Sequence, residues 1–119
     1  MEQKIIDNKI FNLAHDLTNY GLKNNTNYTA LVKNRKCGDK IKVELKIKNK
    51  KIINMKYETE SCIFCQASAS YLSKNIKNFK IHEIDKLTSN KKFKFLFSKK
   101  YFQRKDCILL PFNAVKKAI

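Results

Sequence analysis

Residues 61–70 read Ser61-Cys62-Ile63-Phe64-Cys65-Gln66-Ala67-Ser68-Ala69-Ser70. The residues before this stretch alternate as in a β-strand, and those after it have helical spacing. We therefore expect Cys62 at a strand-to-helix junction, where unpaired backbone N–H groups and the helix dipole favour negative charge. Such a setting lowers the pKa of a thiol and favours the thiolate, which binds metals and attacks sulfur.

Three runs upstream alternate between apolar and polar residues. The apolar members are Tyr28, Ala30 and Val32 in the first run, Ile41, Val43, Leu45 and Ile47 in the second, and Ile53, Met55 and Tyr57 in the third. Asn49-Lys50 can turn the chain between the second and third runs. The pattern predicts three strands in one antiparallel sheet with a polar outer face.

Helical spacing predicts a first helix over residues 4–19 and a second over 63–77. The apolar stripe of the first comprises Ile6, Ile10, Leu13, Ala14 and Leu17. Ser68 and Ser70 are small and suit close packing of the second helix on the sheet. Shorter helices are expected over 80–87 and 109–118, the latter with Pro111 in its first turn.

Length and composition indicate one small domain over residues 1–119. No window is apolar enough for a membrane helix, and the first residues resemble neither a secretory signal nor a transit peptide. The four cysteines without an export signal therefore point to the reducing cytoplasm, where cysteines are commonly metal ligands or reactive thiols.

The formal net charge of +16 raises the question of nucleic-acid binding. However, only Arg35 and Arg104 are arginines among 26 basic residues, and base-edge readout favours arginine. The lysines are also spread along the chain. We expect solvated lysine faces and no nucleic-acid partner; docking to an acidic protein or to nucleic acid are the alternatives.

Cys37-Gly38-Asp39 precedes the second strand, and Cys62 follows the third. In an antiparallel meander, the start of strand two and the end of strand three lie at the same end of the sheet, so these segments should be neighbours. Cys107 lies just before the last predicted helix. We expect Cys37, Asp39, Cys62 and Cys107 to converge on one site, because three thiolates and a carboxylate can enclose Zn²⁺ or Fe²⁺.

Cys65 has three interpretations that the sequence leaves open. It could be a small buried apolar residue, an auxiliary thiol for sulfur relay or redox pairing with Cys62, or a metal ligand. The Cys62-x-x-Cys65 spacing also suits a zinc ribbon, but a ribbon uses two such pairs, and the chain has one.

Three groups of residues together resemble the U-type iron–sulfur cluster assembly scaffolds, namely the Isc and Suf U-proteins and the N-terminal module of Nif U-proteins. The groups are Cys37-Gly38-Asp39, Ser61-Cys62 with Gln66-Ala67-Ser68-Ala69-Ser70, and Arg104-Lys105-Asp106-Cys107 before Leu109-Leu110-Pro111-Phe112. The resemblance implies an α+β fold: a three-stranded antiparallel sheet, with an N-terminal helix and C-terminal helices packed on one face.

The resemblance also implies a scaffold and sulfur acceptor rather than an enzyme. Cys37, Asp39, Cys62 and Cys107 would hold Zn²⁺, Fe²⁺ or a transient [2Fe–2S] cluster. A cysteine desulfurase would deliver persulfide sulfur to Cys107, and apo iron–sulfur proteins or carriers would receive the cluster. Arg104 would support the metal site, and a homodimer around a shared cluster is possible.

Some residues depart from the family pattern. Arg35 stands where many members have proline, and Asp106 stands where the Isc branch has histidine. The branch therefore stays open, and so do two alternative functions: a zinc-bound sulfur acceptor that serves a Suf-type desulfurase, and a basic, zinc-stabilised nucleic-acid-binding module.

Overall fold

The computed structural model describes residues 7–119, so Ile6 of the expected first helix lies outside the described residues. The elements are α1 (Asn8–Ala14), β1 (Tyr28–Lys33), β2 (Lys40–Lys48), β3 (Lys51–Glu60), α2 (Ile63–Asn75), β4 (Phe79–Lys80), the 3₁₀ helices η2 (Ile81–Lys86), η3 (Lys91–Phe97) and η4 (Lys99–Arg104), and α3 (Lys105–Ala118).

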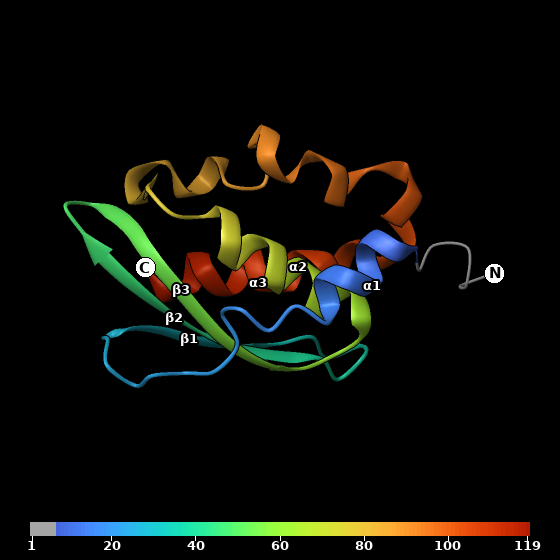
Figure 1. The fold of residues 1–119 in the computed structure, drawn as a ribbon, viewed down its shortest axis with the longest axis horizontal. Coiled ribbons are helices and arrows are strands. Elements are labelled where there is room, and N and C mark those ends of the chain that lie inside the picture. The colour runs from blue at the N-terminus through green and yellow to red at the C-terminus, as the bar shows by residue number, and fades with distance from the viewer. Residues whose placement is uncertain (1–6) are drawn as a thin grey trace.

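The sheet is antiparallel and has the strand order β1-β2-β3-β4. The long helices α2 and α3 cover one face of it, and the 3₁₀ helices run beyond α2 (Figure 1). α3 lies against β1 and β2, α2 lies against β3, and α1 packs on α2. The α+β fold is confirmed. None of the helices within residues 7–119 is long and apolar enough to cross a membrane.

The expected count of three strands is wrong by one. A fourth strand of two residues, β4, pairs with the start of β3 through Lys51↔Lys80 and Ile52↔Phe79. Two residues are too few to give an alternating pattern, so the sequence carries no period-2 signal for β4.

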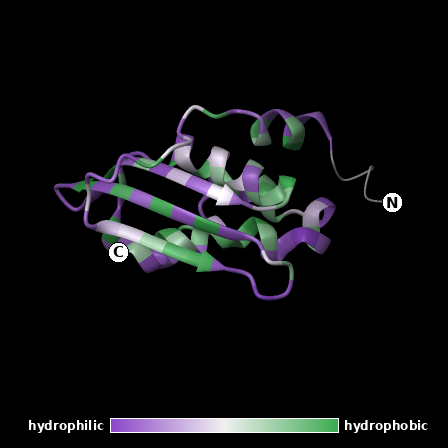
Figure 2. Ribbon diagram, turned by 90° about the horizontal axis from the view of Figure 1, so that it is seen from below, coloured by the Kyte–Doolittle hydropathy of each residue, from purple (hydrophilic) through white to green (hydrophobic). Residues whose placement is uncertain are grey.

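Apolar and polar residues alternate along the strands (Figure 2), and the turn expected at Asn49-Lys50 is present, with φ of 54° and 63°. The expected inward position of Ile53 is wrong. The register shifts between Lys46 and Ile47, so that Ile47 pairs with Ile52 and Lys46 pairs with Asn54. This β-bulge leaves Ile53 37% exposed and buries Ile52 completely.

The first helix is shorter than expected. α1 begins after Asp7, whose carboxylate accepts a hydrogen bond from the Ile10 N–H at 2.9 Å, and it ends at Ala14. Asp16 then accepts hydrogen bonds from the backbone N–H and the hydroxyl of Thr18, an alternative to helical bonding. Leu17, expected in the apolar stripe, is consequently 63% exposed.

The last helix is longer than expected, because α3 begins at Lys105 and not near residue 109. Pro111 therefore lies inside the helix and not in its first turn. It is tolerated there although it cannot donate a backbone hydrogen bond to the carbonyl of Cys107, four residues earlier. The segment expected as a helix over 80–87 contains the 3₁₀ helix η2.

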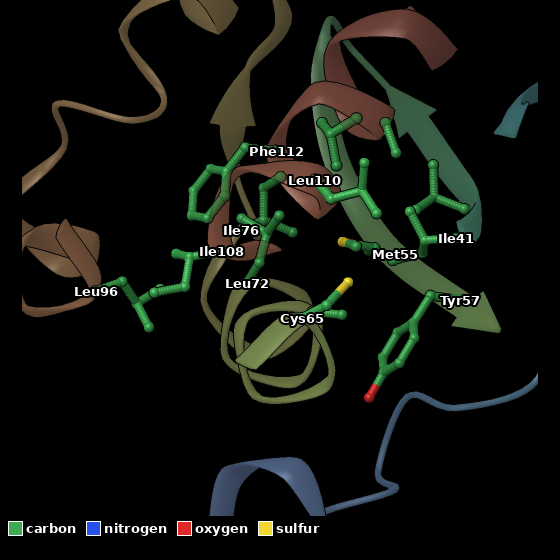
Figure 3. Close-up of a cluster of buried hydrophobic side chains, with 14 of the residues drawn as sticks. Ile41, Met55, Tyr57, Cys65, Leu72, Ile76, Leu96, Ile108, Leu110 and Phe112 are labelled. Carbon is green, nitrogen blue, oxygen red and sulfur yellow. The ribbon is translucent and has the colours of Figure 1, made fainter. Parts of the chain in front are cut away.

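The core lies between the sheet and the two long helices (Figure 3). The labelled side chains come from β2 and β3 (Ile41, Met55, Tyr57), α2 and its C-cap (Cys65, Leu72, Ile76), α3 (Ile108, Leu110, Phe112) and η3 (Leu96). Ser68 and Ser70 are buried at the α2 surface, as expected of packing residues. Their hydroxyls donate to the carbonyls of Ile108 at 2.6 Å and Asp16 at 3.2 Å. The serines thereby join α2 to α3 and to the segment after α1.

Candidate metal centre

One end of the sheet brings the first two candidate segments together. Lys40 pairs with Glu60, so the start of β2 lies beside the end of β3. The turn before β2 is closed by two backbone hydrogen bonds, from Gly38 N–H to the Asn34 carbonyl (2.8 Å) and from Asn34 N–H to the Asp39 carbonyl (2.7 Å). Gly38 has a φ of 76°, a conformation that favours glycine. This turn places the side chains of Cys37 and Asp39, on either side of Gly38, in the same group as Cys107.

Cys37, Asp39 and Cys107 form a tight group. One ligand atom from each, the two sulfurs and a carboxylate oxygen, lies within 4.8 Å of the other two. Asp39 and Cys107 are buried, and Cys37 is exposed. Such a spacing is compatible with three ligands that move slightly inward around one ion. That these residues bind a metal remains a prediction.

Cys62, the fourth predicted ligand, lies at the edge of this group. Its backbone N–H donates to Oδ1 of Asp39 at 3.3 Å, and its thiol interacts with the thiol of Cys107. Within residues 7–119, however, its sulfur is not part of the mutual 4.8 Å set. Cys62 is the N-cap of α2, as the strand-to-helix junction predicted.

The second oxygen of Asp39 tests whether the site suits a cation. Oδ2 is buried and finds no hydrogen-bond partner within the described residues 7–119. A buried carboxylate oxygen without a partner is costly, because desolvation is not compensated. A metal ion at the centre of the group would supply the missing partner, so the donor set fits Zn²⁺ or Fe²⁺.

The expectation of lowered thiol pKa values is wrong for the metal-free protein. Burial raises the pKa of Cys62, although the N–H groups of Cys65 and Phe64 at the start of α2 oppose this shift. Burial also raises the pKa of Cys107, and the neighbouring Cys62, Asp39 and Cys37 raise it further. Desolvation and clustered negative groups thus outweigh the helix N-termini. Metal binding must therefore displace protons from these thiols.

Cys65 lies in the core, fully buried, and its sulfur points from α2 toward β3 (Figure 3). Its surroundings are not entirely apolar, because the Thr59 hydroxyl lies 3.9 Å from the sulfur and Ser61 also interacts with it. Burial raises the pKa of Cys65 to about 12. The position agrees with a buried packing residue and leaves the role of an auxiliary thiol open.

Arg104 directly precedes α3 and lies beside the candidate site. Its guanidinium carbon is 5.7 Å from the ring centroid of Phe64, a cation–π contact with the first turn of α2. Its predicted role toward the metal remains a prediction. A groove of about 360 Å³, lined in part by Arg35, Lys36 and Asp106, opens next to Cys37 and Cys107 in the chain.

The sequence interpretation gave no structural role to two polar residues near the site, Thr59 and Gln66. Thr59 donates its hydroxyl proton to the Lys40 carbonyl (2.6 Å) or to the Ser61 hydroxyl (2.7 Å). The Gln66 side-chain amide donates to the Ser61 carbonyl at 2.8 Å. These bonds fix the short segment that carries Cys62. The sequence does contain a signal that could have identified Thr59: it is a polar residue at a position of β3 where the alternation of Met55 and Tyr57 predicts an inward apolar side chain.

Comparisons with known proteins support the family resemblance. The family model described as NifU-like N terminal domain matches residues 5–119. Among functionally curated proteins, none matches the chain.

Two solved structures share the fold. The N-terminal NifU-like protein from Brucella abortus has a TM-score of 0.79 and 20% sequence identity, and the match covers 98% of this chain and 93% of that one. A putative iron–sulfur cluster assembly scaffold protein for the SUF system, from thermophilic Fervidobacterium islandicum AW-1, has a TM-score of 0.82 and 20% identity over 98% of each chain. The chain belongs to the family of NifU-like N-terminal domains.

Proposed function

We propose that this protein is an iron–sulfur cluster assembly scaffold. Cys37, Asp39, Cys62 and Cys107 hold Fe²⁺ and then a transient [2Fe–2S] cluster, which is the cargo that the protein passes on. The observation that carries this proposal is the cluster of two thiols and a carboxylate within 4.8 Å, in which Oδ2 of Asp39 is buried and unpartnered among the described residues.

The ligand set suits temporary storage. Soft thiolates bind iron strongly, whereas the hard oxygen of Asp39 makes the bound metal more exchangeable. Cys37 is exposed at the rim, and Asp39 and Cys107 are buried beneath it. The site is therefore open on one side, which leaves a route for delivery and release.

In this proposal a cysteine desulfurase delivers persulfide sulfur to Cys107, and apo iron–sulfur proteins or carriers receive the cluster. The basic groove that Arg35 and Lys36 line in part is suited to an acidic surface of such a partner. All four cysteines are free thiols, a state that the reducing cytoplasm maintains. The protein acts as scaffold and sulfur acceptor and not as an enzyme.

Anaerobic reconstitution tests the proposal. The purified protein is incubated with a cysteine desulfurase, cysteine and Fe²⁺, and iron, zinc, sulfide and visible absorbance are measured. We expect a coloured protein with bound iron and sulfide, and loss of the colour in Cys37→Ser and Cys107→Ser. Asp85→Asn, which changes an exposed carboxylate elsewhere, is the control.

A colourless protein after reconstitution would contradict the scaffold function. Stoichiometric zinc together with stimulation of the desulfurase, and no cluster, would instead identify a zinc-bound sulfur acceptor. Salt-dependent retention of DNA or RNA in the absence of both activities would point to a nucleic-acid-binding module.

A further inference from the structure

The inference concerns the source of electrons for sulfide, and it rests on the proposed function. Sulfur that arrives as a persulfide is at the oxidation level of elemental sulfur, whereas a cluster contains sulfide. Each sulfur atom must therefore gain two electrons before it can bridge iron. Two thiols that join in a disulfide release two electrons, so a neighbouring pair of cysteines can supply them.

Cys62 and Cys65 form such a pair at the start of α2. Cys62 is the N-cap, and Cys65 is the third residue of the helix. Residues three apart on a helical turn face the same side, and the Cys-x-x-Cys spacing suits a disulfide. Cys62 is partly exposed, whereas Cys65 is fully buried. The first thiol can therefore meet an incoming sulfur compound, and the second can react only through its neighbour.

Cys62 also contacts the proposed sulfur acceptor. Its thiol interacts with the thiol of Cys107, so a sulfur atom added to Cys107 would lie beside Cys62. The sulfur of Cys62 lies outside the mutual 4.8 Å group of Cys37, Asp39 and Cys107. Cys62 can thus react with sulfur on Cys107 while Cys37 and Asp39 stay together, and Cys107 rejoins them when it is freed.

The surroundings of Cys65 include polar groups that a purely apolar packing site would lack, although burial raises its pKa to about 12. Thr59 presents its hydroxyl 3.9 Å from the Cys65 sulfur, and Ser61 interacts with the same atom. Hydroxyl groups beside a buried sulfur can accept its proton in a hydrogen bond and stabilise the thiolate when it forms.

We propose that Cys62 and Cys65 are an internal dithiol reductant, which converts persulfide sulfur on Cys107 into sulfide at the metal-ligand group. Cys65 is the resolving thiol. It frees Cys107 from the disulfide that the first step creates, and thereby returns Cys107 to the metal.

The reaction has two balanced steps. First, the Cys62 thiolate attacks Sγ of the Cys107 persulfide. The Cys62–Cys107 disulfide forms, the bond between Sγ and the outer sulfur breaks, and the outer sulfur leaves as HS⁻ with the electron pair of that bond. Second, Cys65 attacks Sγ of Cys62 and loses its proton. The Cys62–Cys65 disulfide forms, the bond between Sγ of Cys62 and Sγ of Cys107 breaks, and Cys107 leaves as a thiolate that takes up the proton.

In sum, one persulfide and two thiols give one disulfide, one free Cys107 thiol and one hydrogen sulfide. The two electrons gained by sulfur are those lost by Cys62 and Cys65. A dithiol reductant from outside then reduces the Cys62–Cys65 disulfide by exchange and prepares the protein for the next sulfur atom.

Chemical loading with glutathione persulfide tests this sequence without a desulfurase. The reduced protein is treated anaerobically, desalted and left without added thiol. Sulfide is measured over time, and the cysteines are mapped by mass spectrometry after trypsin. Trypsin places Cys62 and Cys65 in the peptide 57–74 and Cys107 in the peptide 106–116.

For the unaltered protein we expect one sulfide per persulfide, a peptide 57–74 lighter by two hydrogens, and a free thiol on Cys107. Cys62→Ser should lose sulfide release and retain the persulfide on peptide 106–116. Cys65→Ser should release sulfide but accumulate peptide 57–74 linked to 106–116, because the first disulfide is no longer resolved. Cys65→Ala, which avoids a new buried hydroxyl, should give the same linked product.

A stable persulfide on Cys107 of the unaltered protein would overturn the inference, and so would the absence of peptide 57–74 linked to 106–116 in both Cys65 variants. Failure of Cys62→Ser to retain any persulfide on Cys107 would overturn it as well. The scaffold function fails differently: the disulfide and sulfide form as expected with glutathione persulfide, but reconstitution with desulfurase and Fe²⁺ yields no cluster.

Discussion

Asp7 and Asp39 are two carboxylates beside the N-termini of two helices, and their surroundings differ. Asp7 caps α1: Oδ1 accepts from the Ile10 N–H at 2.9 Å, and Oδ2 accepts from the Tyr101 hydroxyl at 2.7 Å and the Lys100 ammonium at 2.6 Å. Asp39 faces α2 with one bond to the Cys62 N–H at 3.3 Å, and its buried Oδ2 has no partner within residues 7–119.

The difference separates a structural carboxylate from a candidate ligand. Every acceptor atom of Asp7 is used inside the protein, so its role ends with holding α1 to η4. Oδ2 of Asp39 is buried beside two thiols without a hydrogen-bond partner among the described residues. The desolvation of this oxygen costs free energy, which a bound cation would offset. Burial alone would not have distinguished a ligand from a packing residue; the count of satisfied oxygens does.

The largest expected difference between Asp39 and Asp7 is in their effect on metal affinity. Asp39→Asn removes the ligand charge, and we expect Zn²⁺ binding to weaken by at least about 10–100-fold, the loss typical of changing a residue that only supports a ligand. Asp7→Asn should leave the affinity unchanged. Competition titration with a chelator measures both. Equal losses in the two variants would show that the effect is structural and not due to ligation.

In the absence of metal, a substitution of Asp7 should lower the free energy of unfolding more than one of Asp39, the reverse of the order expected for metal affinity. Asp7→Ala loses the helix cap and the bonds to η4, so the free energy of unfolding should fall by about 1–2 kcal/mol. Asp39→Ala loses one long hydrogen bond and an unpartnered oxygen, and should cost less than about 0.5 kcal/mol. Urea denaturation with a chelator present compares them. A larger loss for Asp39→Ala would contradict the assignment.

Acid should abolish the charge contribution of Asp7. Partial burial favours a higher pKa, but hydrogen bonds from Lys100, the Ile10 N–H and Tyr101 lower the pKa of Asp7 from 3.8 to about 2. The stabilisation is therefore present above pH 4 and lost as the pH falls toward 2.

Asp7→Asn keeps the cap but removes this charge. We expect it to be about 0.5–1 kcal/mol less stable than the unaltered protein at neutral pH, a small value because Lys100 is about half exposed. The two unfolding curves should approach each other below pH 4 and meet only below pH 2. A difference that persists undiminished at pH 2 would show that the charge is not its source.

Among the contacts of Asp7, the smallest effect is expected at the hydroxyl of Tyr101. Tyr101→Phe removes its hydrogen bond to Asp7, and the free energy of unfolding should fall by about 0.5 kcal/mol. Tyr28→Phe, at an exposed tyrosine, is the matched control and should change nothing. Thermal unfolding followed by circular dichroism suffices for the pair. Equal effects would assign no stabilising role to the Tyr101 bond.

The strands of the meander could be predicted because their apolar residues alternate without interruption, and the sheet end follows from strand direction alone. The β-bulge, which turns Ile52 and not Ile53 into the core, could not be predicted from the sequence, because two adjacent isoleucines fit either register. The pairing that decides between them depends on Ile47 across the hairpin. Long-range pairing of this kind leaves no trace in a local pattern.

The approach of the Cys37 segment to Cys62 follows from the hairpin, whereas Cys107 was placed in the site by its chemistry as a third thiolate and not by the geometry of the sheet. The early start of α3 at Lys105 was missed because Pro111 resembles a first-turn proline. The raised pKa values of the thiols were also missed, since helix position is visible in the sequence but desolvation and neighbouring sulfurs are not. The unpartnered oxygen of Asp39 is likewise a purely three-dimensional property.

The hydrogen bond from Ser68 to the Ile108 carbonyl has a consequence for how the thiols are carried. Pro111 cannot donate a backbone hydrogen bond to the Cys107 carbonyl, and the hydroxyl of Ser68 on α2 holds the next carbonyl, that of Ile108, at 2.6 Å. The same α2 bears Cys62 at its first end. Helix α2 therefore carries Cys62 directly and is joined by Ser68 to the residue after Cys107. A partner that displaced α2 would be expected to move both sulfurs relative to Cys37 and Asp39.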